Sequence, residues 1–147
     1  MTTGLALVRK IALDIGSKRI GIAITDETNT LARPLTTIER SNVKTEAKML
    51  TRIIKENEVD IIVAGMPVDL KGAKGVAAQN IEEYLEKLDK LTDTPIIRYD
   101  ERFTTKIAED FLRASGLKKG KRKKIIDEAA ATIILQNYLE HAKKNQA

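Results

Sequence analysis

Two short apolar runs joined by a tight polar connection constrain the fold of this chain most strongly. In Ile11–Ile15 and again in Ile20–Ile24, every second residue is isoleucine or leucine, and only Gly16–Arg19 separates the two runs. Alternation with a period of two is typical of β-strands that bury one face in a core. The short connection predicts that the two strands pair as an antiparallel hairpin.

The rest of the chain predicts an α/β fold built on a mixed five-stranded sheet. A third strand completes an antiparallel meander, because the connection DETNT is rich in turn residues. A helical spacing of apolar residues leads into VDIIVAG, a continuous apolar run that is typical of a strand covered on both faces. This order indicates a parallel crossover, so we expect two parallel strands beside the three antiparallel ones, with helices on both faces. The expected strands are 8–15, 21–25, 31–38, 59–65 and 94–100, and the expected helices are about 42–57, 76–91, 104–114 and 124–144.

The composition narrows the partners and the kinds of site. The 147 residues predict one domain, residues 1–147. They include 26 Lys and Arg against 21 Asp and Glu, a net charge of +5 that suggests a polyanionic partner. Cysteine is absent and His141 is the single histidine, so any metal must be held by oxygen. No apolar run approaches membrane-spanning length, so we expect a cytoplasmic protein with no membrane association.

Asp14 places a charge inside the first predicted strand, where burial is expensive unless something compensates for it. Strand alternation puts Asp14 on the same face as Ala12, and the next strand offers Gly21 and Ala23 on the corresponding face. Pairing of the two strands would make a floor of very small side chains beside the carboxylate, with room for a substrate backbone or a metal. The alternatives are a buried ion pair with Lys10 or an Asx turn at the strand end.

Two further acidic segments can complete a metal site. Asp100 and Glu101 stand at the C-terminal end of the last predicted strand, where ligands gather in parallel sheets. Asp127 begins the last predicted helix on its apolar face. Carboxylates without histidine or cysteine are the ligands that Mg²⁺ or Mn²⁺ requires, and two such ions, about 3.5–4 Å apart, can activate water and stabilise the leaving oxygen of a phosphodiester. Taken alone, Asp127 is equally well explained as a helix N-cap. Taken alone, Asp100 and Glu101 are better explained as solvated charges at a strand end.

Several motifs resemble those of a known family over most of the chain, from about Ala12 to Leu139. In order, they are LDIGSKRIGIAITD, PLTTI, VAGMPVDLKGAKG, YDERFTTKIAEDFL and KRKKIIDEAAATIILQNYL. They are similar to the motifs of the YqgF family, also called the RuvX family. The resemblance implies an RNase H-like fold related to RuvC-type resolvases. It also implies a metal-dependent nuclease that matures the precursor of 16S rRNA, an assignment that displaced an earlier Holliday junction resolvase label.

The same resemblance implies roles for individual residues. Asp14, Glu101 and Asp127 would be the catalytic acids and the ligands of two Mg²⁺ or Mn²⁺ ions. Consecutive strand residues point to opposite faces, so only one of Asp100 and Glu101 should reach the metals, and family similarity favours Glu101. The loop that contains Asp69 departs from the more usual family version, so no role is assigned to Asp69.

Basic and hydroxyl residues closely follow the predicted acids. Lys18, Arg19 and Arg102 are expected to contact phosphates beside the scissile bond. Without the motif, solubilising charges at a hairpin tip would explain the first two equally well. Thr104 and Thr105 are expected to cap the helix that follows them, with a hydroxyl contact to phosphate as the alternative.

A strongly basic run precedes the last predicted helix. Six of the seven residues from Lys118 to Lys124 are basic. We expect a loop that orders against nucleic acid as a clamp on the backbone, with a salt-dependent affinity, rather than only a solvated run. The residues expected to form this clamp are Lys121, Arg122 and Lys123. Aromatic residues make up 3% of the chain, so recognition should depend on backbone and shape more than on base stacking.

These features and the resemblance together favour an enzyme that hydrolyses structured RNA. The resemblance implies that its substrate is the rRNA precursor, free or within pre-ribosomal particles, and we expect the protein to act as a monomer or a homodimer. A second interpretation keeps the site but makes branched, four-way DNA the substrate, which demands two sites in a symmetric dimer. A third is a catalytically silent nucleic-acid-binding module that binds without metal. An ATP-handling relative of the actin-like fold is disfavoured, because a single domain lacks the second lobe that closes over a nucleotide.

Overall fold

The computed structural model describes residues 9–67, 75–100 and 119–146, with the backbone alone at positions 119–128 and 143–146. Its strands are β1 (Arg9–Ile15), β2 (Arg19–Thr25), β3 (Ala32–Glu39), β4 (Val59–Met66) and β5 (Ile96–Asp100), and its helices are α1 (Val43–Glu56), α2 (Val76–Asp89) and α4 (Lys119–Gln146). The helix expected at 104–114 lies outside the described residues. Each of the five expected strands is present, with its ends shifted by no more than a few residues.

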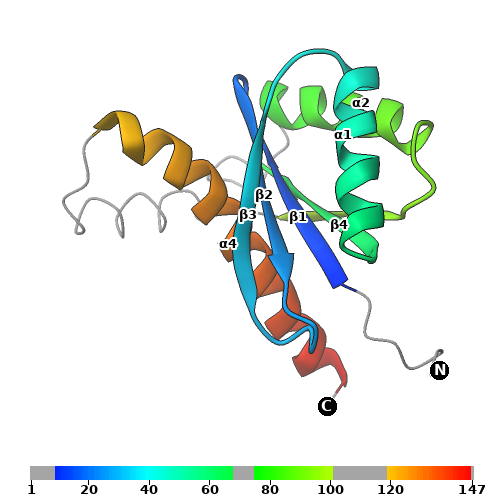
Figure 1. Ribbon diagram of the computed structural model, residues 1–147, viewed down its shortest axis with the longest axis vertical. Coiled ribbons are helices and arrows are strands. Elements are labelled where there is room, and N and C mark those ends of the chain that lie inside the picture. The colour runs from blue at the N-terminus through cyan, green and yellow to red at the C-terminus, as the bar shows by residue number, and fades with distance from the viewer. Residues whose placement is uncertain (1–8, 68–74, 101–118, 147) are drawn as a thin grey trace.

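The strands form one mixed sheet in the order β3-β2-β1-β4-β5 (Figure 1). The pairs β1–β2 and β2–β3 are antiparallel, and the pairs β1–β4 and β4–β5 are parallel. This arrangement confirms the predicted meander extended by two parallel strands. β1 lies at the centre of the sheet, so its backbone is held by a neighbour on each side.

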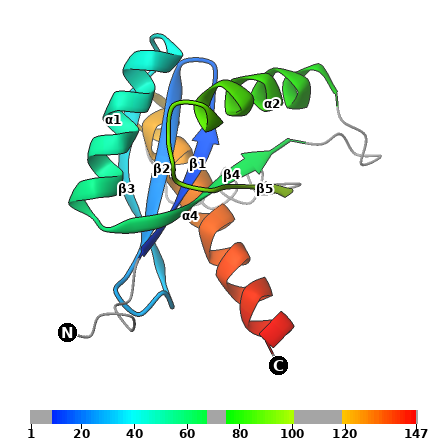
Figure 2. The same cartoon turned by 90° about the vertical axis from the view of Figure 1, so that its right-hand side faces the viewer.

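Different helices cover the two faces of the sheet, as predicted. Helices α1 and α2 cover one face, and α4 crosses the other (Figures 1 and 2). The core beneath α1 and α2 includes Ile11, Leu13, Ile20, Ile22, Ile24, Leu50, Ile62, Leu85 and Leu88. The core beneath α4 consists of Ala12, Ala23, Val63, Ala131, Ile134 and Leu135. Alternation along β1 and β2 therefore sorts large side chains to one face and small ones to the other.

Helix α4 is longer than the sequence predicted. It begins at Lys119, so the expectation of a loop is wrong from Lys119 to Lys124, and these residues form the first turns of the helix. Lysine and arginine are good helix formers, and a helix that is packed further along extends at little additional cost, so neither the charge nor Gly120 interrupts it. None of the helices described here has the length and apolar character needed to cross a membrane.

Candidate active site

Asp14 lies near the end of β1, on the face of the sheet that α4 covers. Its partner across the hairpin is Gly21, and the neighbouring pair on the same face is Ala12 with Ala23. Both alanines are fully buried, whereas Asp14 is half-buried. The structure therefore confirms the floor of very small side chains that the alternation predicted beside this carboxylate.

Helix α4 meets this floor through a small residue of its own. Ala131 belongs to the core cluster that contains Ala12 and Ala23. Position 127 precedes Ala131 by four residues, one helical turn or about 6 Å along the axis, and falls on the same face of the helix. In Figure 2, α4 starts near the end of the sheet that carries the β1–β2 turn and runs toward the end that carries both termini. The backbone of position 127 is thus displaced from Ala131 toward the start of α4.

Polar contacts that the sequence analysis did not foresee anchor α4 at both edges of the sheet. Gln136 Oε1 accepts from the Ala32 backbone N–H at 2.9 Å, and its amide donates to a carbonyl of the β2–β3 turn at 3.2 Å. At the other edge, Tyr99 of β5 packs edge-on against Tyr138, with ring centroids 6.0 Å apart, and its hydroxyl hydrogen-bonds to His141 Nδ1. These contacts fix the rotation of α4 about its axis.

Lys18 and Arg19 lie at the β1–β2 turn, at the same end of the sheet as Asp14. The turn is closed by the Gly16 backbone N–H, which donates to Arg19 O at 2.9 Å. A Cβ atom at position 16 would lie 2.9 Å from that oxygen, so the turn requires glycine. Lys18 is exposed, whereas Arg19 begins β2, is half-buried and by alternation shares the face of Gly21 and Asp14. Their location matches the expectation, and their role stays a prediction.

Arg40, just after β3, supports this turn, and the sequence analysis missed it. Its backbone N–H donates to Lys18 O at 3.0 Å, and its guanidinium donates to Gly16 O. The same guanidinium donates through Nε to Glu46 Oε2 at 3.0 Å. Arg40 thereby ties the turn that follows Asp14 to the end of β3 and to α1.

Glu46 holds Arg40 in place from the first turn of α1. Its side chain is fully buried and also accepts from the Ser41 backbone N–H at 2.7 Å and from the Tyr84 hydroxyl at 2.8 Å. The Arg40 guanidinium stacks over the Tyr84 ring, 4.9 Å from its centroid. Burial raises the pKa of Glu46, but its hydrogen bonds with Ser41, Tyr84 and Arg40 outweigh burial and hold that pKa below its ordinary value. An acid on the apolar side of an amphipathic helix was the one sequence signal for this cluster.

Asp100 lies on the opposite face of the sheet from Asp14. In β5, Tyr99 packs against α4, whereas Arg98 forms ion pairs of 2.9 and 3.0 Å with Glu82 and Asp89 of α2. Alternation gives Asp100 the face of Arg98, and its side chain is exposed. This arrangement argues against Asp100 as a partner of Asp14.

Most of the other predicted site residues are not described in full. Glu101, Arg102, Thr104 and Thr105 lie outside the described residues, and Lys121, Arg122, Lys123 and Asp127 belong to the part of α4 in which the backbone alone is described. The structure therefore places Asp14, Lys18 and Arg19 together and gives the backbone position of Asp127.

The surroundings of Asp14 fit a hard cation. Its carboxylate offers oxygen ligands, and Gly21 opposite it has no side chain to fill the adjacent space. Among the described side chains, no group of three His, Cys, Asp or Glu residues converges on one point. Two of the three predicted ligands, Glu101 and Asp127, are not among those side chains.

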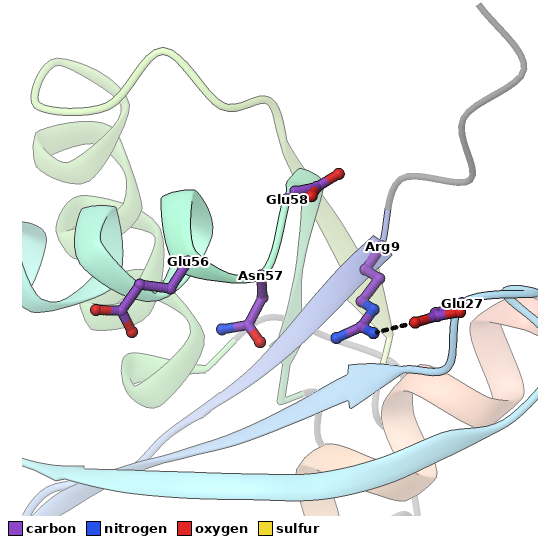
Figure 3. Close-up of a pocket in the computed structure, with 5 residues that line it drawn as sticks. All are labelled: Arg9, Glu27, Glu56, Asn57 and Glu58. Atoms are coloured by element: carbon purple, nitrogen blue, oxygen red, sulfur yellow. Dashed lines mark hydrogen bonds and ion pairs between the residues drawn. The ribbon is translucent and has the colours of Figure 1, made fainter. Parts of the chain in front are cut away.

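A separate cavity of about 310 Å³ lies at the other end of β1 (Figure 3). Its lining residues are Arg9, Glu27, Glu56, Asn57 and Glu58, and Arg9 forms an ion pair with Glu27 at 3.3 Å. Because Arg9 begins β1 and Asp14 stands near its end, this cavity is not part of the candidate site.

The sequence matches known proteins over almost its whole length. The family described as RuvX, Holliday junction resolvase, matches residues 8–141. A protein of Caldanaerobacter subterraneus subsp. tengcongensis, described as "Putative pre-16S rRNA nuclease", is 40% identical over 139 residues, which cover 94% of this chain and 100% of the relative. A protein of Fusobacterium nucleatum with the same description is 44% identical over 138 residues, which cover 92% of this chain and 99% of the relative.

Two solved structures with a similar fold are resolvases in complex with Holliday junctions. RuvC of T. thermophilus in complex with a Holliday junction substrate has a TM-score of 0.57 at 14% identity, covering 92% of this chain and 96% of that one. The fowlpox virus resolvase in complex with Holliday junction DNA has a TM-score of 0.55 at 16% identity, covering 92% of this chain and 99% of the resolvase chain. These likenesses confirm the predicted RNase H-like fold of the RuvC type.

Proposed function

This chain belongs to the RuvX family, and from that membership we propose that it is a metal-dependent nuclease that processes the precursor of 16S rRNA. The observation that carries the proposal is the placement of Asp14 on a central strand, over a floor of glycine and alanine and beside a turn with two basic residues. The relatives described as pre-16S rRNA nucleases, at 40% and 44% identity, support the substrate.

In the proposed site, Asp14, Glu101 and Asp127 hold two divalent ions, Mg²⁺ or Mn²⁺. When bound, such ions supply an activated water and stabilise the leaving oxygen of the phosphodiester. The contribution of the chain is to keep its carboxylates in fixed positions. β1 does this for Asp14, because the strand is paired with β2 on one side and β4 on the other.

Basic residues hold the substrate strand in this proposal. Lys18, Arg19 and Arg102 contact the phosphates on either side of the scissile bond, and Thr104 and Thr105 add hydroxyl contacts or cap their helix. The basic start of α4, with Lys121, Arg122 and Lys123, acts as the backbone clamp. Since these three residues are helical rather than in a loop, the positive end of the helix dipole adds to their attraction for phosphate.

The test compares wild type with Asp14→Asn on a 16S rRNA precursor, with Mg²⁺ or Mn²⁺ and with EDTA. Loss of a residue that merely orients a metal ligand reduces activity about 10–100-fold, so removal of a ligand charge should reduce cleavage by more than about 100-fold. Binding of the RNA in EDTA and the thermal midpoint should change little. Asp100→Asn is the matched control, since Asp100 lies on the other face, and it should cleave like wild type. Cleavage by Asp14→Asn at the wild-type rate would refute the assignment.

A second candidate substrate is the four-way DNA junction, because both structural neighbours named above were solved with Holliday junctions. This function requires a homodimer that presents two sites. A synthetic four-way junction in the same assay separates the two candidates. Metal-dependent cleavage of the junction, with the RNA left intact, would favour the resolvase. No cleavage of either substrate, with salt-sensitive binding retained, would identify a binding module instead.

A further inference from the structure

The exposed side of α1 carries a stripe of four basic residues, which we call the α1 stripe. Its members are Lys44, Lys48, Arg52 and Lys55, and the spacings of four, four and three residues place them on one side of the helix. All four are exposed, and the stripe extends about 16 Å along the axis. Helix α1 covers the face of the sheet opposite α4, so the stripe and Asp14 lie on different faces of the molecule (Figure 2).

The α1 stripe has no ion-pair partner among the described residues. Within the described part of the chain, none of its four side chains forms an ion pair or a hydrogen bond. Of the acidic residues of α1, Glu46 is buried, and Glu56, four residues after Arg52, forms no ion pair with the stripe in the described part of the chain. Like charges four residues apart destabilise a helix, and the pairs Lys44–Lys48 and Lys48–Arg52 both have this spacing. A polyanion bound along the stripe would relieve this repulsion.

Helix α2, on the same face of the sheet, has the opposite character. Its acidic residues include Glu82, Glu83, Glu86 and Asp89. Two of them, Glu82 and Asp89, form ion pairs with Arg98 of β5. In α2 these four acids stand against one base, Lys87, so of the two described helices on this face α1 carries the excess positive charge, as expected of a binding surface.

A hollow of about 350 Å³ runs beside the α1 stripe. It is lined by Lys44, Ala47, Lys48, Thr51 and Leu91. Its walls are mainly apolar, and two lysines of the stripe border it. Among the described lining residues, Leu91 is the one large apolar side chain, whereas protein docking sites usually bury several large apolar or aromatic anchors. A sugar–phosphate backbone fits better, with its sugars toward the hollow and its phosphates toward the lysines.

We propose that the α1 stripe is a second nucleic-acid contact, which binds the phosphate backbone of a double-helical part of the RNA substrate at a distance from the cleavage site. This inference deepens the proposed function and rests on it for the identity of the substrate. Double-helical RNA is recognised mostly through its shape and its phosphates, which suits a row of flexible cations without aromatic residues. The stripe then strengthens binding of structured RNA and takes no part in the chemistry.

The test measures binding of a fluorescent RNA hairpin in EDTA, so that no cleavage occurs, between 50 and 200 mM salt. The variant Lys48→Gln with Arg52→Gln removes two charges of the stripe. The control, Arg33→Gln with Lys87→Gln, removes two exposed charges elsewhere. Each lost phosphate contact lowers the slope of log K against log salt by about 1, so the stripe variant should lower it by about 2. The control should leave the slope unchanged.

A cleavage assay on a short single-stranded RNA, in the presence of Mg²⁺ or Mn²⁺, separates this inference from the proposed function. The stripe variant should cleave that substrate at the wild-type rate, whereas Asp14→Asn should not cleave it. The thermal midpoint of the stripe variant should equal or exceed that of wild type, because like-charge repulsion is reduced. A stripe variant that binds the hairpin with the affinity and salt slope of the control would overturn the inference, even if Asp14→Asn is inactive.

Discussion

The two faces of the sheet are built from the same strands, but one face is packed with large side chains and the other with small ones. Beneath α1 and α2, β2 contributes Ile20, Ile22 and Ile24, and all three are fully buried. Beneath α4, the same strand contributes Gly21 and Ala23. Large side chains on the first face bury much apolar area, which stabilises the fold. Small side chains on the second allow α4 to pack closely while space is left beside Asp14.

The two faces also differ in how deeply their carboxylates are buried. Glu46, on the inner side of α1, is fully buried and has partners for its hydrogen bonds. Asp14, on the α4 face, is half-buried. A buried carboxylate with several donors fixes neighbouring segments in place, whereas a partly exposed one is accessible to substrate or metal. The comparison teaches that the face toward α1 and α2 supports the candidate site structurally, whereas the face toward α4 carries its half-buried carboxylate.

The largest expected effect on stability comes from removing a large side chain on the α1 and α2 face. Ile22→Ala should lower the free energy of unfolding by about 2–5 kcal/mol, because it leaves a cavity in a fully packed core. Urea denaturation measures this change. Ile22→Leu conserves volume and should lower stability by less than about 1.5 kcal/mol. Equal losses for the two variants would show that this face is not tightly packed.

The next effect comes from the buried carboxylate. Glu46→Ala should lower the free energy of unfolding by about 3 kcal/mol, because it leaves Arg40 and the Tyr84 hydroxyl without their partner. We expect a loss at the low end of the range for breaking a buried ion pair, because the Arg40 side chain is 27% exposed and stays partly solvated. Glu83→Ala, at an exposed position of α2, is the control and should change stability by less than about 0.5 kcal/mol. If the two variants lose the same stability, Glu46 does not support the turn.

A smaller effect is expected from enlarging a residue on the α4 face. Ala23→Leu should lower the free energy of unfolding by about 1–3 kcal/mol, because the added atoms push α4 away from the sheet. Ala77→Leu, at an exposed position of α2, provides the control and should have little effect. Tolerance of leucine at position 23 would contradict the close approach of α4.

The smallest effect is a dependence of stability on pH. The folded protein holds the pKa of Glu46 below its ordinary value of 4.5, so the ionised carboxylate contributes stability above pH 4.5. That contribution is lost as the pH falls below 4.5 through the folded pKa. Thermal midpoints of wild type and Glu46→Gln, measured between about pH 6 and pH 3, should therefore converge as the solution becomes acidic. A constant difference would show that the carboxylate of Glu46 is not responsible.

Local patterns predicted much of the candidate site. The parts that they did not predict depend on packing between distant segments. Alternation predicted that Asp14, Gly21 and Ala23 share a face, and the register of the hairpin confirms it. Composition and spacing did not predict that the basic run from Lys119 belongs to α4, because helix extension depends on packing further along the chain. The roles of Glu101 and Asp127 stay predictions, supported by membership of the family.

The sequence by itself determined which residues share each face of the strands, because the period of a strand is a property of local backbone geometry. It also determined the parallel crossover and the helices on both faces. The tertiary structure alone decided that Arg40 ties the β1–β2 turn to Glu46, and that Gln136 binds the backbone of a residue 104 positions away. Such contacts join segments that meet when the sheet and its helices pack together, and no periodic pattern within either segment encodes them.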